Sequence, residues 1–288
     1  MVTPVSPLLR QNEVGRGKTR WGAGWIHGRL WAVTDLNSLA NRIADVGGVV
    51  GVVLGGSRAR GTADEHSDTD LGVYRRGAMD LSALREIAAE WPGSAVTEPG
   101  EWGPWVDGGA WLTTPGSKTD LLWRDLDRVV GVLAEARRGV VRCEAQVGHP
   151  LGFFSYAYLA ELATSKVLAD PAGALAEVRT ELDPYPVELT AAIERTYGFE
   201  AGFSVDNAVV PAARGDRFSA TGFLFRGIGC LVHVLHARAG VWLATEKNAV
   251  ASAAKLAGAP TDFAARVDHI LATTDVAAAK DLLSECPL

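Results

Sequence analysis

One stretch, residues 49–74, constrains the fold more than any other, because it joins two predicted strands through a glycine turn. It reads VVGVVLGGSRARGTADEHSDTDLGVY. The apolar run at its start predicts a buried strand, and the turn that begins at Gly55 offers backbone N–H groups that can receive a phosphate. Asp68 and Asp70 follow at strand spacing, so both carboxylates share one face of a second strand. Two neighbouring carboxylates are costly unless a cation lies between them.

The patterns on either side of this stretch change along the chain. Residues 36–46 carry an apolar stripe of helical period, residues 81–91 predict another helix, and Thr119 to Trp123 predicts a short strand. Helical periodicity dominates from about Asp125 onward. The helices expected there lie near residues 125–138, 151–168, 171–182, 187–204, 217–239, 246–256, 260–271 and 274–285.

The chain has 288 residues, which exceeds the usual size of one domain, and strands precede helices. We therefore expect an α+β protein in which a small mixed β-sheet with flanking helices is followed by an all-α domain. The expected parts are an N-terminal extension (1–33), a catalytic domain (34–145) and a helical substrate-binding domain (146–288).

Composition narrows the class of protein. A net charge of −6 argues against a broad surface for long nucleic acids and suits a small or cationic partner. The three cysteines are far apart and form no CxxC pair, which predicts reduced thiols. We recognise no signal peptide and expect no apolar window as long as a membrane span, so the protein is expected to be cytoplasmic.

The order of these motifs resembles the nucleotidyltransferase superfamily, which includes DNA polymerase β and the antibiotic nucleotidyltransferases. The superfamily pattern is GS, then DxD, then a later acidic residue on a neighbouring strand. Here these elements are Gly56-Ser57, Asp68-Thr69-Asp70 and Asp120. Residues 225–255 also resemble the substrate domain of aminoglycoside adenylyltransferases.

The resemblance implies a set of site residues and cofactors. It implies that Asp68, Asp70 and Asp120 are catalytic and hold two Mg²⁺ ions, and that a nucleoside triphosphate is the co-substrate. The residues implied to contact that nucleotide are Gly55, Gly56, Ser57, Arg58 and Lys247, with Arg60 and Lys166 as further candidates. Asp120 is also a candidate general base, and Glu101 and Asp107 remain open as alternatives to it.

The implied reaction is transfer of AMP from ATP to a hydroxyl group of a small acceptor such as an aminoglycoside. Two alternatives stay open: a toxin-type transferase that modifies tRNA or a protein, and a catalytically silent nucleotide-binding protein. No membrane partner is expected, nucleic acid is disfavoured by the acidic balance, and the oligomeric state is left open.

Several other motifs have simpler interpretations. The glycine turn is not a P-loop, because Thr62 stands where the phosphate-binding lysine is required. It is not the nucleophile elbow of a serine hydrolase either, because Ala59 replaces the last glycine of that motif. His233 and His236 share a helix face and are expected in the core. The tryptophans of the β-like segment are expected mostly in the core, with a lining for a cationic sugar site as the alternative: Trp102, Trp105 and Trp111.

Overall fold

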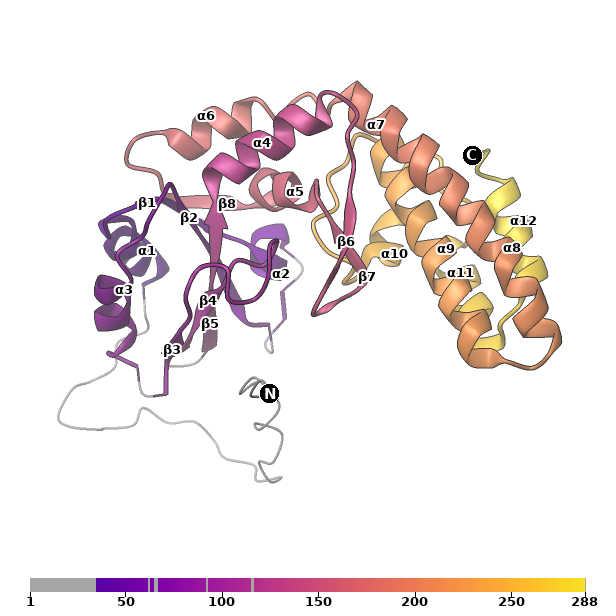
Figure 1. Cartoon of the computed structure of the whole chain (residues 1–288), viewed down its shortest axis with the longest axis horizontal. Helices are drawn as coiled ribbons and strands as arrows, with labels where there is room; N and C mark the ends of the chain where they lie inside the picture. Colours follow the sequence, from indigo (N-terminus) through magenta and orange to yellow (C-terminus); the bar gives the residue numbers. More distant parts are fainter. Residues whose placement is uncertain (1–34, 62, 65–66, 92, 115–116, 288) are drawn as a thin grey trace, which may run out of the picture.

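The computed structural model describes residues 35–61, 63–64, 67–91, 93–114 and 117–287. The predicted extension, residues 1–33, lies outside them. A mixed β-sheet with helices on both faces is followed by a bundle of helices beside it (Figure 1). The strands are β1 Val49–Leu54, β2 Thr69–Arg75, β3 Ala95–Val96, β4 Gly109–Thr114, β5 Ser117–Asp125, β6 Cys143–Gln146, β7 His149–Phe154 and β8 Lys166–Ala169.

Helices make up most of the rest of the described chain. They are α1 Leu36–Ala44, α2 Gly56–Arg60, α3 Leu81–Ala88, α4 Leu126–Ala136, α5 Ala157–Thr164, α6 Ala174–Thr180, α7 Val187–Ile193, the π-helix η2 Glu194–Gly198, α8 Phe199–Ala213, α9 Arg217–Arg238, α10 Ala249–Ala253, α11 Phe263–Thr273 and α12 Val276–Ser284. Asp35 caps α1 and Asp80 caps α3 by accepting backbone N–H bonds, as the polar side chains before these apolar stripes require. The predicted α+β class is confirmed.

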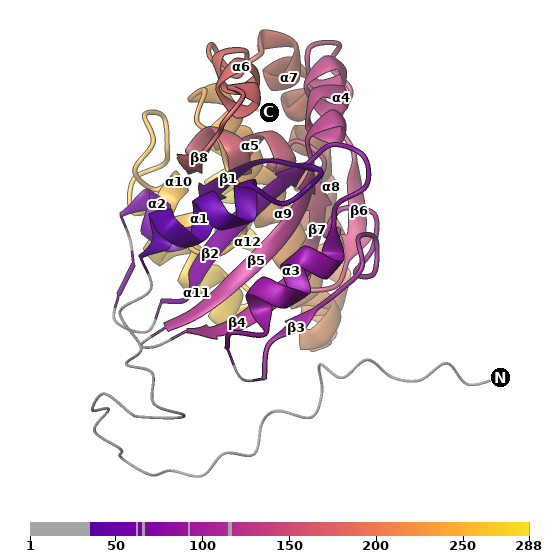
Figure 2. The same cartoon turned by 90° about the vertical axis from the view of Figure 1, so that its left-hand side faces the viewer.

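The larger sheet has the order β3-β4-β5-β2-β1-β8. β2 and β5 are parallel, and the other neighbouring pairs are antiparallel. Because side chains alternate along a strand, Leu71 and Leu121 point to one face, where they are buried under α1 and α3. Figure 2 shows these two helices in front of the sheet and the helical region behind it. Asp70 and Asp120 therefore point toward the helical region.

The segment 151–168 is not the predicted helix. It forms the end of β7, then α5, then β8, and β8 pairs with β1 at the edge of the larger sheet. A short apolar run cannot be assigned to helix or strand by its period alone. In β7, Leu151 and Phe153 alternate into the core, and Gly152 at φ +100° approaches the Sγ atom of Cys143 too closely for any side chain. The described part of the region predicted to be all-α thus contains the two strands β7 and β8, and the boundary at residue 146 stays a prediction.

Two of the helices also differ from expectation. α7, η2 and α8 follow one another without interruption, so the helix predicted to end near residue 204 continues to Ala213. α9 is long and apolar enough to cross a membrane, which corrects the expectation that no window reaches that length. More than half of its most apolar window is buried inside the protein, as in the core helix of a soluble protein.

Candidate functional site

Asp70 and Asp120 lie side by side on the parallel strands β2 and β5. The two residues are register partners, so their side chains leave the same face of the sheet about 5 Å apart along the direction of the interstrand hydrogen bonds. The strand pattern that buries Leu71 and Leu121 on the other face leaves both carboxylates here. Asp68 lies just before β2 and is exposed. The structure thus places the three predicted aspartates at one end of two neighbouring strands.

The charge of Asp68 acts on the carboxylates of both Asp70 and Asp120. Burial, followed by the charges of Asp68 and Asp70, raises the pKa of Asp120 to about 6. Burial also raises the pKa of Asp70, to which the charge of Asp68 contributes. The Oδ1 atom of Asp120 is buried and has no hydrogen-bond partner. This part of the sheet therefore concentrates negative charge that its own hydrogen bonds do not compensate.

The glycine turn packs directly against Asp70. The Gly55 N–H donates to the backbone oxygen of Asp70 at 2.8 Å, and Gly56 has a left-handed φ of +61°. A Cβ atom on Gly56 would lie 1.8 Å from the Oδ2 atom of Asp70. Glycine is therefore required at position 56 by backbone conformation and by the close approach of the carboxylate. Ser57 follows in the first turn of α2.

The two arginines of α2 have different surroundings. The Arg58 guanidinium donates to the backbone oxygens of Ser67 at 2.7 Å and Asp68 at 3.2 Å, so it fixes the loop before β2. Arg60 is exposed, and its charge lowers the pKa of Asp70 against the stronger effect of burial. Of the two, Arg60 is the one whose charge acts on the candidate site in this structure.

Lys247 approaches from the helical region. Its charge favours the ionised forms of both Asp70 and Asp120. It lies in the segment between α9 and α10, where His149 Nδ1 and Glu246 Oε2 are 3.2 Å apart and connect this segment to β7. Lys166, in contrast, is exposed on the edge strand β8, and the main causes of the shifted pKa values of the two aspartates do not include its charge.

The alternative acids are placed elsewhere. Asp107 is buried and accepts a hydrogen bond of 2.7 Å from Arg75. Since Arg75 ends β2, five residues beyond Asp70, this pair lies about 17 Å along the strand from the glycine turn. Glu101 is exposed, and its Oε2 atom accepts the N–H of Glu98. Neither residue shares the register position of Asp120.

An ion pair between buried Arg124 and Glu161, which the sequence does not reveal, lies farther along the same face of the sheet. Arg124 is on the same face of β5 as Asp120, and its Nη2 atom is 2.9 Å from Glu161 Oε1 on α5. The charge of Glu161 raises the pKa of Asp70 further. No local motif joins residues 37 positions apart in the chain, so only the folded structure brings this pair together.

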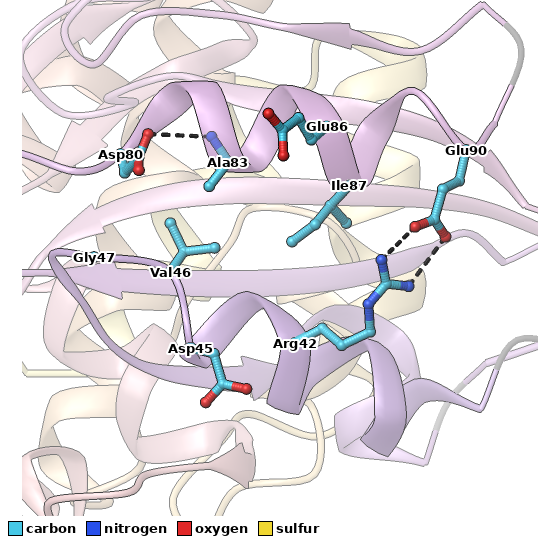
Figure 3. Close-up of a pocket in the computed structure, with 9 residues that line it drawn as sticks. All are labelled: Arg42, Asp45, Val46, Gly47, Asp80, Ala83, Glu86, Ile87 and Glu90. Carbon is cyan, nitrogen blue, oxygen red and sulfur yellow. Dashed lines mark hydrogen bonds and ion pairs between the residues drawn. The ribbon is translucent and has the colours of Figure 1, made fainter.

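Other residues considered in the sequence are accounted for by packing. His233 stacks on Phe154 and hydrogen-bonds the Tyr156 hydroxyl at 2.9 Å, and His236 is buried too. All three cysteines are free thiols. A hollow between α1 and α3 contains the Arg42–Glu90 ion pair, and no predicted site residue lines it (Figure 3).

The donor set suits a hard divalent cation. Carboxylate oxygens are the ligands that Mg²⁺ prefers, and a cation between these aspartates would relieve their repulsion and satisfy the partnerless oxygen of Asp120. Within the described ranges, however, no group of three or more His, Cys, Asp or Glu side chains is already arranged around one metal position. The residues fit the cation chemically, without a preassembled cluster.

Comparison with known proteins gives a partial match. Residues 36–91 match the family model described as a nucleotidyltransferase domain, a segment that includes the glycine turn, Asp68 and Asp70. This match supports the predicted superfamily resemblance and nucleotidyl transfer in general, while the narrower resemblance to aminoglycoside adenylyltransferases is not shown. Asp120 lies beyond the matched residues.

Whole-chain comparisons add little. No curated protein matches the chain significantly. One similar solved structure is a nucleotidyltransferase-like protein from Exiguobacterium sibiricum 255-15, with 11% identity, a TM-score of 0.41, and an alignment that covers 86% of this chain and 72% of that chain. A similarity at this level carries no conclusion about function.

Proposed function

We propose that the chain is a nucleotidyltransferase that moves a nucleoside monophosphate from a nucleoside triphosphate to a hydroxyl group and releases pyrophosphate. The observation that carries this proposal is the register pairing of Asp70 with Asp120 beside Gly56, in a sheet whose strands β1 and β2 lie within the segment that matches the nucleotidyltransferase domain. A silent binding protein has no need for neighbouring carboxylates in which the charges of Asp68 and Asp70 raise the pKa of Asp120.

Each residue has a role that follows from its place. The backbone N–H of Gly56 and the Ser57 hydroxyl would hold the β- and γ-phosphates, and Arg60 and Lys247 would supply positive charge. Gly55 would shape this turn, because its own N–H donates to the backbone oxygen of Asp70. We assign Arg58 to the loop before β2, because its donors are already used there. These contacts would orient the triphosphate with its α-phosphorus above the aspartates.

The chemical step is an in-line displacement. The acceptor oxygen bonds to the α-phosphorus, the bond from that phosphorus to the bridging oxygen of pyrophosphate breaks, and pyrophosphate leaves with the electron pair. The acceptor proton passes to the carboxylate of Asp120, whose pKa is raised to about 6 and which shares one face of the sheet with Asp70. Two Mg²⁺ ions held by Asp68, Asp70 and Asp120 would supply positive charge against the phosphate oxygens.

We further propose ATP as the donor and a small cationic acceptor such as an aminoglycoside. The net charge of −6 supports a cationic acceptor, and the resemblance stated above supports AMP as the transferred group. The same catalytic residues would serve a toxin-type transferase acting on tRNA or on a protein hydroxyl, so the acceptor must be identified by assay.

The test incubates the protein with Mg²⁺, each of four α-labelled nucleoside triphosphates and a panel of aminoglycosides, lincosamides, tRNA and protein. Label should appear on one acceptor class, and Asp70→Asn should lower the rate at least about 100-fold. The matched control is Asp45→Asn, which removes an exposed carboxylate that ends α1. Full activity in Asp70→Asn, or a wild-type protein that neither binds nor turns over any triphosphate with Mg²⁺, would refute the proposal.

A further inference from the structure

Two tryptophans lie beside the aspartates on the same face of the sheet. Trp111 of β4 is the register partner of Asp120, so its side chain leaves the sheet next to that carboxylate. The residue is 36% exposed, whereas tryptophan is highly buried on average. Trp102 is adjacent to it, with ring centroids 4.8 Å apart and planes tilted by 38°. We call Trp102 and Trp111 the tryptophan shelf.

Contacts with neighbouring residues hold the tryptophan shelf in place. A Cβ atom on Gly109 would lie 2.1 Å from the backbone oxygen of Leu121 and 3.0 Å from the Trp102 ring, so glycine at this position allows the close approach of β5 and of the indole. Gln146, on β6, donates its side-chain N–H to the Trp102 backbone oxygen at 2.9 Å. Trp105, the third tryptophan of the segment, is buried against Phe153 and belongs to the core. The two shelf residues are therefore held at the surface while their neighbour is not.

The sheet order places the shelf opposite the predicted phosphate site. The glycine turn follows β1, Asp70 is on β2, Asp120 is on β5 and Trp111 is on β4, and these strands are consecutive neighbours. The shelf is thus about 5 Å from Asp120 and about 10 Å from Asp70, on the side away from the turn. An in-line displacement requires the attacking oxygen to approach opposite the leaving pyrophosphate.

We infer that the tryptophan shelf binds the acceptor through a flat ring face, either a sugar ring or an aromatic ring, next to the hydroxyl that is modified. This inference rests on the proposed function, which sets the direction of attack. An indole gains by stacking on the C–H face of a sugar or on an aromatic ring, and a protonated amine on the acceptor adds a cation–π contribution. The shelf thereby selects ring-bearing acceptors over flexible alcohols.

The test compares Trp111→Thr with Trp111→Phe and the wild-type protein. Threonine suits a strand and removes the ring, phenylalanine keeps a ring, and Phe218→Ala is the control because Phe218 is an exposed aromatic on α9. Transfer is measured with glycosides, aryl alcohols and the ringless acceptor glycerol. Trp111→Thr should raise KM for ring-bearing acceptors about 10-fold and leave KM for the triphosphate and for glycerol unchanged. Trp111→Phe should recover most of the loss.

A binding measurement separates this inference from the proposed function. Saturation-transfer NMR with the same glycosides and aryl alcohols reports contact with the wild type and loss of contact in Trp111→Thr, whether or not a triphosphate is turned over. Contact without any turnover would sink the proposed function and leave the shelf in place. The inference is overturned if no ring-bearing probe contacts the protein, if Trp111→Thr binds and turns over like the wild type, or if Trp111→Thr raises KM for the triphosphate, since the ring would then hold the nucleobase.

Discussion

Gly56→Ala should be far more damaging than alanine at the other end of the same short helix. Gly56 and Gly61 both have left-handed φ angles, of +61° and +71°, so alanine at either position carries a conformational cost of about 1 kcal/mol. Around Gly61 nothing lies within 4 Å of the added Cβ atom, whereas at Gly56 the new atom would overlap the Asp70 carboxylate at 1.8 Å. The difference between Gly56→Ala and Gly61→Ala therefore measures the cost of the overlap with Asp70 apart from the cost of backbone strain.

The size of the destabilisation depends on which part of Asp70 can move away from the new Cβ atom. The Asp70 backbone is fixed by β2 and by the bond from Gly55, so only its side chain can rotate away, at a further cost of about 1 to 3 kcal/mol. Gly56→Ala should thus lower the free energy of unfolding by about 2 to 4 kcal/mol and Gly61→Ala by about 1 kcal/mol. The displaced carboxylate no longer lies beside Asp120, so nucleotidyl transfer should fall about 100-fold in Gly56→Ala only.

Urea unfolding followed by tryptophan fluorescence measures the stabilities, and a double-mutant cycle with Asp70→Ala tests the cause. In that background the overlapping oxygen is absent, so Gly56→Ala should cost no more than Gly61→Ala. The cycle should give a coupling of about 1 to 3 kcal/mol. Equal costs for the two glycine variants in the wild-type background, or a coupling near zero, would show that the reasoning from the close approach is wrong.

Three more predictions concern charge. Because the pKa of Asp120 is raised to about 6, its ionised form destabilises the metal-free fold as pH rises from about 4 to 6. In EDTA, Asp120→Asn should raise the free energy of unfolding by about 1 kcal/mol at pH 8 and leave it unchanged near pH 4. A lower free energy of unfolding at pH 8 would contradict this. Burial lowers the pKa of His233 to about 3, so the free energy of unfolding should fall as pH drops from 6.5, by up to about 1.4 kcal/mol per unit, and His233→Gln should lose this slope in urea titrations. Glu246→Gln weakens the contact with His149 and should displace the neighbouring Lys247, which raises KM for the triphosphate. Lys247→Met should raise the same KM. Additive effects on KM in the double variant would show that Glu246 does not act by positioning Lys247.

The parts of the fold that were predictable are those with a local pattern. An apolar run before Gly55 and the alternation that follows Asp70 predict β1 and β2, and the structure has both strands. The shared strand face of Asp68 and Asp70 stays a prediction, because β2 begins at Thr69 and Asp68 lies before it. The helix near residues 36–46 is also predictable, because its apolar stripe is local in the chain, and the structure has α1 there.

The parts that were not predictable depend on partners far apart in sequence. Glu161 meets Arg124 across 37 residues, and His149 meets Glu246 across 97, and no periodicity encodes such pairs. The strand β8 was hidden because its four residues continue an apolar segment that reads equally well as helix. Exposure of Trp111 was missed for a related reason: its sequence neighbourhood resembles that of the buried Trp105.

β8 also has a consequence for the order in which the chain can fold during synthesis. β1 emerges from the ribosome early, but the strand that covers its outer edge is not made until residues 166–169. Until then β1 presents a row of open N–H and C=O groups, the arrangement through which nascent chains pair with one another. A fragment that ends near residue 145 would keep that exposed edge permanently, so the N-terminal half can leave the aggregation-prone state only after the first part of the helical half has been translated.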